Sequence, residues 1–115
     1  MSTIISFLTN IPEKLLDALT STADTKSSAY GIPSKAFARG RLITWQSVMN
    51  VNPDAISLQL QGAINDVEAE YAVLDTSTSV TGEMRHVGPV NLRFLRVRQV
   101  SRTAGTSVTV TVMVA

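Results

Sequence analysis

The sequence predicts an all-β protein, an antiparallel β-sandwich of jelly-roll type with an extended N-terminal arm. Three observations lead to this fold class. The 115 residues include 13 Thr and 13 Val while only 17% are charged, a composition that favours strands over helices. From residue 41 onward, apolar and polar residues alternate in short segments. Turn formers separate these segments at the spacing typical of sandwiches, and the length suits one small domain.

The first part of the chain reads differently from the rest. We assign residues 1–40 to an N-terminal arm with a first strand or short helix, and residues 41–115 to the sandwich core of a single domain. Residues 13–19 satisfy helix periodicity, but their length is marginal for a helix, so a strand and a helix both remain open. Residues 20–28 are polar and without period, which is typical of a loop or an extended arm.

The central segment predicts consecutive strands joined by turns. Residues 41–50 alternate so that Ile43 and Trp45 share one face. Residues 56–61 alternate more regularly and predict a half-buried strand. Further strands are expected at residues 69–74 and 83–87, and turns at residues 52–54, 65–66 and 88–89.

The last two strands are the best defined. Residues 90–100 contain two apolar patterns that are out of step, which predicts a bulge near Phe94 and Leu95 or burial on both faces. Residues 108–114 alternate Val with Thr or Met and contain no charge. Such a strand must be paired on both edges. It lies either in the centre of the sandwich or against a neighbouring subunit.

Composition and motifs exclude several classes of function. Without Cys the chain has no disulfide and no thiolate nucleophile. The single histidine, His86, has no second ligand or triad partner at a recognisable spacing, so we expect no enzyme, no metal and no cofactor. Strand alternation would put Glu68 and Glu70 on one face, and a solvated face is their default interpretation.

The overall charge and hydropathy pattern also limits the partners. A net charge of +1 argues against direct nucleic-acid binding. No apolar run approaches the roughly 20 residues that span a bilayer, and the first residues lack the features of a signal peptide. We therefore expect neither a nucleic acid nor a membrane as partner.

The charges that are present segregate along the chain. Residues 54–83 carry six acidic residues and no base, whereas residues 85–102 carry five Arg and no acid. Either the acidic and basic strands pair with each other inside the sandwich, or they face outward and dock other subunits. A second candidate contact is the apolar cluster near the N-terminus, because exposed apolar patches usually mark contacts. The candidate partner-interface residues are Ile4, Ile5, Phe7, Leu8, Arg85, Arg93, Arg96 and Arg98.

The succession of segments from residue 41 onward resembles a known family. It consists of LQLQG at 58–62, EYAVLDTST at 70–78, GEMR at 82–85, VNLRFLRV at 90–97 and TSVTVTV at 106–112. This pattern resembles the jelly-roll head decoration, or cement, proteins of tailed bacteriophages. The resemblance implies a non-enzymatic virion protein, assembled in the host cytoplasm, whose partners are the major capsid protein and copies of itself.

A second resemblance implies a different role. QGAIND at 61–66, Tyr71, LD at 74–75 and RFLRV at 93–97 are similar to discoidin-type galactose-binding sandwiches, although Ala63 and Tyr71 replace the usual Ser and Trp. This resemblance implies, as the alternative, a phage neck, tail or fibre component with a glycan-binding sandwich.

Overall fold

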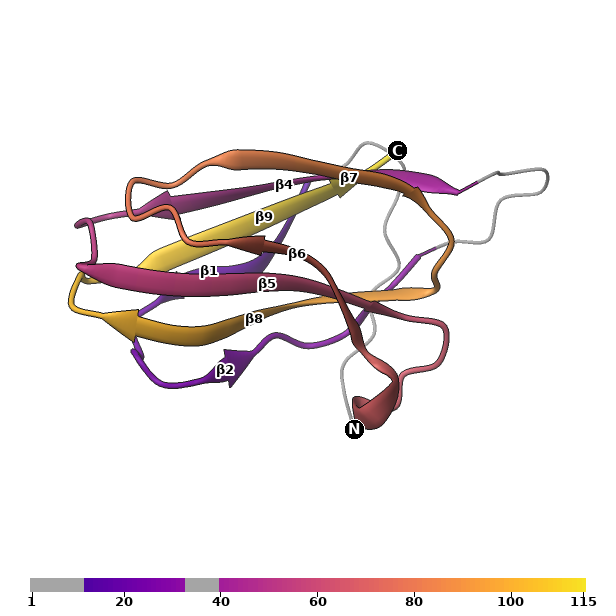
Figure 1. Cartoon of the computed structure of the whole chain (residues 1–115), viewed down its shortest axis with the longest axis horizontal. Helices are drawn as coiled ribbons and strands as arrows, with labels where there is room; N and C mark the ends of the chain where they lie inside the picture. The colour runs from indigo at the N-terminus through magenta and orange to yellow at the C-terminus, as the bar shows by residue number, and fades with distance from the viewer. Residues whose placement is uncertain (1–11, 33–39) are drawn as a thin grey trace.

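The computed structural model describes residues 12–32 and 40–115, and these residues form a sandwich of two antiparallel sheets (Figure 1). The β9 sheet has the order β1 (Glu13–Leu19), β9 (Val108–Val114), β4 (Arg41–Met49) and β7 (Met84–Val90). The β8 sheet has the order β2 (Thr25–Lys26), β8 (Phe94–Thr103), β5 (Ala55–Ala63) and β6 (Ala72–Ser77), and β3 (Tyr30–Gly31) also pairs with β8. With β2 and β3 taken as one interrupted strand, this order is that of a jelly roll. The predicted fold class is confirmed.

The core lies between the sheets and is filled by every second residue of the long strands. The largest fully buried apolar side chains are Ile43, Trp45, Leu58, Leu60, Leu95, Val97, Val108, Val110, Val112 and Val114. β9 lies between β1 and β4, so neighbours from the same chain cover both edges of this valine-rich strand. The central position expected for residues 108–114 as one alternative is therefore the observed one.

Residues 13–19 form a strand, which decides between the two alternatives for this segment. β1 pairs with β9 through a register that shifts twice, between Lys14 and Leu16 and between Leu16 and Leu19. Because of these irregularities, the consecutive residues Leu15 and Leu16 are both buried in the core. The sandwich thus begins well before residue 41.

The connection between β5 and β6 differs from the prediction. A short 3-10 turn, η1 (Glu68–Glu70), occupies the start of the strand expected at 69–74, and β6 begins only at Ala72. Glu68 and Glu70 therefore do not share a strand face. The apolar–polar alternation of β6 extends into the residues of this turn. Periodicity alone therefore places the start of the strand too early.

β7 also differs, because it continues through Gly88 and Pro89 where the sequence predicted its end. β7 is an edge strand of the described sheet, so Pro89, which has no N–H to donate, does not interrupt a ladder on both sides. At Gly88 the φ angle is +125°, and a Cβ there would lie 2.5 Å from the carbonyl oxygen of Arg41. Glycine is required at this position.

The bulge in β8 lies nearer its end than predicted. Ser57 pairs with Ser101 and Leu58 pairs with Gln99, so Val100 is the extra residue. Leu92 lies before β8 and packs against the edge of the core. It is therefore not part of the alternation of β8, and this explains why two apolar patterns meet near Phe94.

Because of the bulge, Gln99 and Arg102 both point inward and are buried. The Gln99 amide donates to the carbonyls of Ser21 and Ala23, each at 2.9 Å. The Arg102 guanidinium donates to the carbonyls of Leu19 and Thr20, at 2.9 and 2.7 Å. These bonds satisfy the main chain where it crosses from the β9 sheet to the β8 sheet.

Candidate interaction surfaces

Arginines at alternate positions of β8 lie on the outer face of the β8 sheet. The buried Arg96 donates through Nε to Oε1 of Gln61 at 2.7 Å, and through Nη1 to Oε2 of Glu68 at 2.5 Å. Its guanidinium carbon also lies 3.9 Å from the centre of the Tyr71 ring. Gln61 in turn donates to Oε1 of Gln59 at 2.9 Å. Arg96 is thus held in the fold from three directions, and it has little surface left for a partner.

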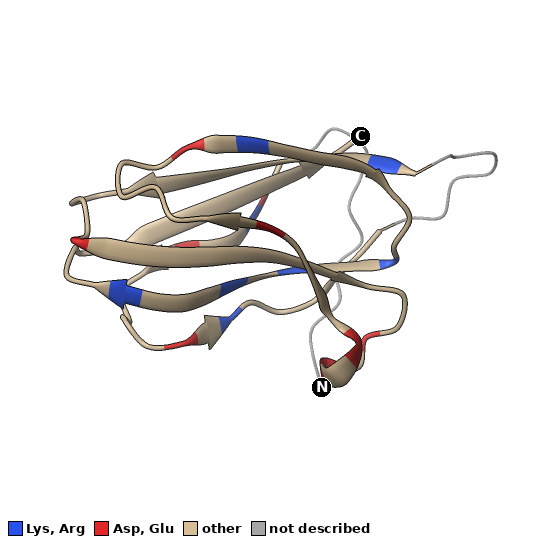
Figure 2. Ribbon diagram, in the orientation of Figure 1, with Lys and Arg blue, Asp and Glu red and all other residues tan. Residues whose placement is uncertain are grey.

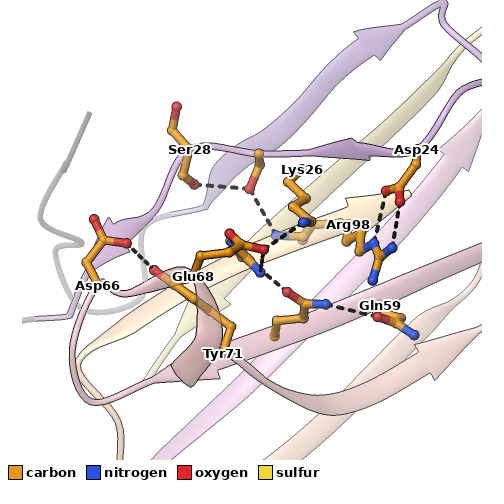
Figure 3. A network of polar contacts seen from close by, with 12 residues as sticks. Asp24, Lys26, Ser28, Gln59, Asp66, Glu68, Tyr71 and Arg98 are labelled. Carbon is orange, nitrogen blue, oxygen red and sulfur yellow. Dashed lines mark hydrogen bonds and ion pairs between the residues drawn. The ribbon is translucent and has the colours of Figure 1, made fainter. Parts of the chain in front are cut away.

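Glu68 is the centre of this network, and Figure 3 shows the side chains that converge on it. Besides Arg96, it accepts a hydrogen bond from Nζ of Lys26 in β2 at 2.6 Å. The hydrogen bonds from Arg96 and Lys26 lower the pKa of Glu68 to about 2. Glu68 therefore links η1 to both β8 and β2.

Tyr71 covers Arg96 and closes the network at its other end. Its hydroxyl donates to Oδ1 of Asp66 at 2.7 Å. Burial, followed by the hydrogen bond to Asp66, raises the pKa of Tyr71. The phenol stays protonated and continues to act as a donor.

The outer Arg98 pairs with the segment before β2 (Figure 3). It donates through Nε to Oδ1 of Asp24 at 2.9 Å and through Nη2 to Oδ2 at 2.5 Å, a two-pronged contact. The hydrogen bonds from Arg98 lower the pKa of Asp24. We call the outer surface of the β8 sheet, with the residues of this network, the ion-paired face.

Arg85 makes a separate contact that joins the two sheets. From β7 it donates to both oxygens of Asp75 in β6, at 2.7 and 2.9 Å, and to Oε1 of Glu83 at 2.6 Å. The buried indole of Trp45 donates to Oδ2 of Asp75 at 2.9 Å. The hydrogen bond from Arg85, together with that from Trp45, lowers the pKa of Asp75. Asp75 fastens the edge of one sheet to the edge of the other.

The charge segregation therefore corresponds to pairing inside the fold for most of the predicted interface arginines. Arg85, Arg96 and Arg98 all contact acidic residues of the same chain. Arg93 differs, because its side chain is exposed and no ion pair is found for it among residues 12–32 and 40–115. The predicted apolar cluster, Ile4, Ile5, Phe7 and Leu8, lies outside the described residues.

Sequence reasoning gave internal pairing with the acidic block as one alternative, and Glu68, Asp75 and Glu83 come from that block, but it did not identify the other partners of these arginines. Tyr71 and Gln61 carry no charge, and Asp24 and Lys26 belong to a segment interpreted as a loop or arm. The available signal was the alternation of Gln59 and Gln61 with buried leucines, which placed two amides on the face that Arg96 and Arg98 share.

The outer face of the β9 sheet has the opposite character. Figure 2 shows β9 without charged residues, in contrast to β8. The outward side chains of β4, β9 and β7 include no Lys, Arg, Asp or Glu, and we call the surface of these three strands the uncharged face. It comprises Leu42, Thr44, Gln46, Val48, Met84, His86, Thr109, Thr111 and Met113. At its edge, β1 carries the exposed Lys14, which lies opposite Thr111 and pairs with Asp17 at 4.0 Å.

Several apolar side chains on the uncharged face are open to solvent. The exposed fractions are 57% for Leu42, 52% for Val48 and 56% for Met84. Between them lies a shallow groove of about 170 Å³, lined by Pro12, Thr44, Gln46, Met84, Thr111 and Met113. Exposed apolar surface of this kind is typical of contact sites.

A second hollow, of about 370 Å³, lies where β5, β6 and the end of β7 approach one another. Its wall is mostly apolar and includes Leu74, Val90 and Leu92, with Glu70 and Asn91 as polar groups. Ile64, which also lines it, is 67% exposed.

The single histidine and the acidic residues were the other candidates for a catalytic or metal-binding role. His86 shares a hydrogen bond of 3.0 Å between its Nδ1 and the hydroxyl of Thr44. Within the described part of the chain, no three His, Cys, Asp or Glu side chains are grouped so that they could hold a metal ion. The same residues include no helix long and apolar enough to cross a membrane.

Comparison with known proteins extends the fold assignment. No protein-family model matches the sequence, and no curated protein matches it significantly. The crystal structure of the SPBc2 prophage-derived protein YomS is similar with a TM-score of 0.59 and 13% identity, over 95% of this chain and 99% of that one. The crystal structure of PirA is similar with a TM-score of 0.50 and 10% identity, over 95% of this chain and 97% of that one. At such identities the likeness shows a shared fold.

Proposed function

We propose that this chain is a non-enzymatic structural protein of a tailed-bacteriophage particle, and specifically a head decoration protein. In this role it binds the major capsid protein on the head exterior, bridges neighbouring capsomers and contacts copies of itself. The observation that carries the proposal is the fold shared with the prophage-derived YomS over nearly the whole of both chains. The pattern resemblance to head decoration proteins supports the finer assignment.

The uncharged face is the surface we assign to the particle contact. Its aliphatic and methionine side chains are exposed, and burying them against a partner removes no charge from water. The ion-paired face is a poorer candidate, because a partner there has to compete with contacts that the chain already makes. In the proposal, Ile4, Ile5, Phe7 and Leu8 belong to the same contact. The exposed Arg93, whose main chain hydrogen-bonds to Ile32 and Ala63 at the end of the β8 sheet, supplies a separate charged contact.

Co-sedimentation of the purified chain with isolated phage heads and, separately, with tails tests this proposal. Val48→Glu introduces a charge on the uncharged face, whereas Val73→Glu introduces the same charge in β6. The two valines are matched, with exposed fractions of 52% and 51%. We expect binding to heads, weakened at least about tenfold by Val48→Glu and little changed by Val73→Glu.

Two outcomes contradict the proposal. Sedimentation with neither heads nor tails removes the virion role, and equal effects of the two substitutions remove the uncharged face as the contact. Arg93→Ala provides a separate check, because it should weaken binding and reduce its dependence on salt without changing the melting temperature.

A neck, tail or fibre protein that binds glycans is the second candidate. The hollow beside Glu70 and Asn91 supports it, because sugar sites combine an apolar wall with a few polar groups. Sedimentation with tails, abolished by Leu74→Glu in this hollow and unaffected by Val48→Glu, favours this candidate over head decoration.

A further inference from the structure

The groove on the uncharged face begins where the described chain begins. Glu13 pairs with Val112 in an antiparallel ladder, so the preceding residue, Pro12, lies opposite Met113. Met113 pairs with Thr44 in β4, and Thr44 pairs with His86 in β7. Pro12, Met113, Thr44 and His86 thus form one row across the sheet, and the groove runs beside this row from Pro12 to Met84.

The segment that precedes Pro12 matches this surface in chemistry. Residues 1–11 contain no Lys, Arg, Asp or Glu, and they carry Ile4, Ile5, Phe7 and Leu8. The segment carries no charged side chain, and none lines the groove; the nearest ion pair is that of Lys14 and Asp17 in β1, at the edge of the sheet. Contact over β9, β4 and β7 therefore buries apolar surface without desolvating an ion pair. The ion-paired face offers no equivalent site, since Lys26, Glu68 and Arg98 lie there.

The segment is also long enough to cross the face. From the β1 edge to β7 there are three inter-strand spacings, about 14 Å. The main chain takes six residue-to-residue steps from Ser6 to Pro12, and six extended steps reach about 20 Å. Residues 4–8 therefore reach every strand from β9 to β7 while the chain remains attached at Pro12.

We propose that residues 4–8 pack across the uncharged face of their own chain, with their apolar side chains over the groove between Met113 and Met84. The tether favours this occupant over a second copy, because a short linker gives an effective concentration in the millimolar range while free protein is micromolar. In this arrangement the segment covers the middle of the face. Leu42 and Val48, at opposite ends of β4, stay open on either side of it.

Disulfide trapping in the free protein tests this contact without any particle. The chain has no cysteine, so introduced pairs are unambiguous. Ser6→Cys leaves all four apolar residues of the segment intact, and His86→Cys places the second thiol on β7 beside the groove. The control pair combines Ser6→Cys with Val67→Cys, a position before η1 that is 48% exposed.

We expect the Ser6→Cys/His86→Cys pair to form an intramolecular disulfide at least about tenfold faster than the control pair at low micromolar protein. Mass spectrometry of unreduced peptides measures both rates. Adding Phe7→Ser to the test pair should lower its rate to that of the control, because Phe7 supplies the largest apolar surface of the segment.

Equal rates for the two pairs would overturn the proposal. Disulfide-linked dimers as the main product would also overturn it, because the occupant is then a second copy. A negative result in this assay leaves the sedimentation results with heads and tails unaffected, so the two proposals fail separately.

Discussion

The two outer faces of this sandwich are both formed by antiparallel strands, yet their side chains make different contacts. On the ion-paired face, Arg96 and Arg98 of β8 are bound by Glu68 and Asp24, and Tyr71 covers one of them. On the uncharged face, Leu42 and Met84 stand in solvent beside a shallow groove. One face is complete within the chain, whereas the other leaves apolar surface available for contact.

This difference changes which residues indicate a partner. A block of arginines in a sequence suggests docking, but three of the four predicted interface arginines contact acidic residues of the same chain. The residues open to contact are Thr, Met and aliphatic side chains, which attract no attention in a sequence because they suit any strand. In a small sandwich with few charges, the surface that lacks charges is the better guide to binding.

The largest expected effect comes from breaking the ion-paired face at its buried centre. Arg96→Met removes the donors to Gln61 and Glu68 and leaves the Gln61 carbonyl oxygen buried without its partner. We expect the free energy of unfolding to fall by about 2 kcal/mol. Gln46→Met, the corresponding polar-to-apolar change on the uncharged face, should alter it by less than about 0.5 kcal/mol. Urea denaturation measures both.

Equal losses for the two variants would show that the network around Arg96 contributes no more to stability than an ordinary surface residue. The contrast between the two faces would then concern composition alone.

Much of the fold follows from local pattern in the sequence. The alternation of Ile56, Leu58 and Leu60, and of the valines from 108 to 114, predicts strands because one face of each is buried. The sequence placed the start of the sandwich core at residue 41, whereas β1 already belongs to it. Residues 13–19 form a short strand, and Leu15 and Leu16 are both buried only because the register with β9 shifts. Bulges and edge positions are set by neighbouring strands, which a single sequence does not show.

The candidate surfaces were less predictable than the fold. That Arg96 is buried depends on η1 folding back over β8, and that Arg98 is paired depends on Asp24 arriving from a distant part of the chain. Asp75 and Trp45 meet across the two sheets, although they are 30 residues apart. Each of these contacts arises from topology, so residue spacing along the chain carries no signal for it.

Low pH should reduce the stabilisation that the ion-paired face provides, because it protonates Glu68. Its pKa is lowered from the ordinary value of 4.5 to about 2 in the folded state. The stabilisation from ionised Glu68 is therefore fully present above about pH 4.5 and is lost as the pH falls toward 2. Glu68→Gln should be less stable than the wild type at pH 7, and the difference should shrink between pH 4.5 and 2.

Urea midpoints at pH 7, 5, 3 and 2 measure this dependence. Glu70→Gln is the matched control, because Glu70 accepts its hydrogen bond from the Asn65 amide rather than from Arg or Lys. The difference in stability between Glu70→Gln and the wild type should not shrink in the same way between pH 4.5 and 2. A Glu68→Gln curve parallel to the wild type would mean that Arg96 and Lys26 do not stabilise the ionised carboxylate.

The smallest effect should come from the rim of the ion-paired face, where Arg98 contacts Asp24. The side chains of this pair are 30% and 46% exposed, so water and salt screen their attraction. We expect Arg98→Gln to lower the melting temperature by less than about 3 °C at low salt, and by still less in 0.5 M NaCl. Arg93→Gln, at an exposed arginine for which no ion pair is found among the described residues, should change it in neither condition. A shift for Arg98→Gln as large as that for Arg96→Met, or one that salt does not reduce, would place the rim and the centre of this face in one cooperative network.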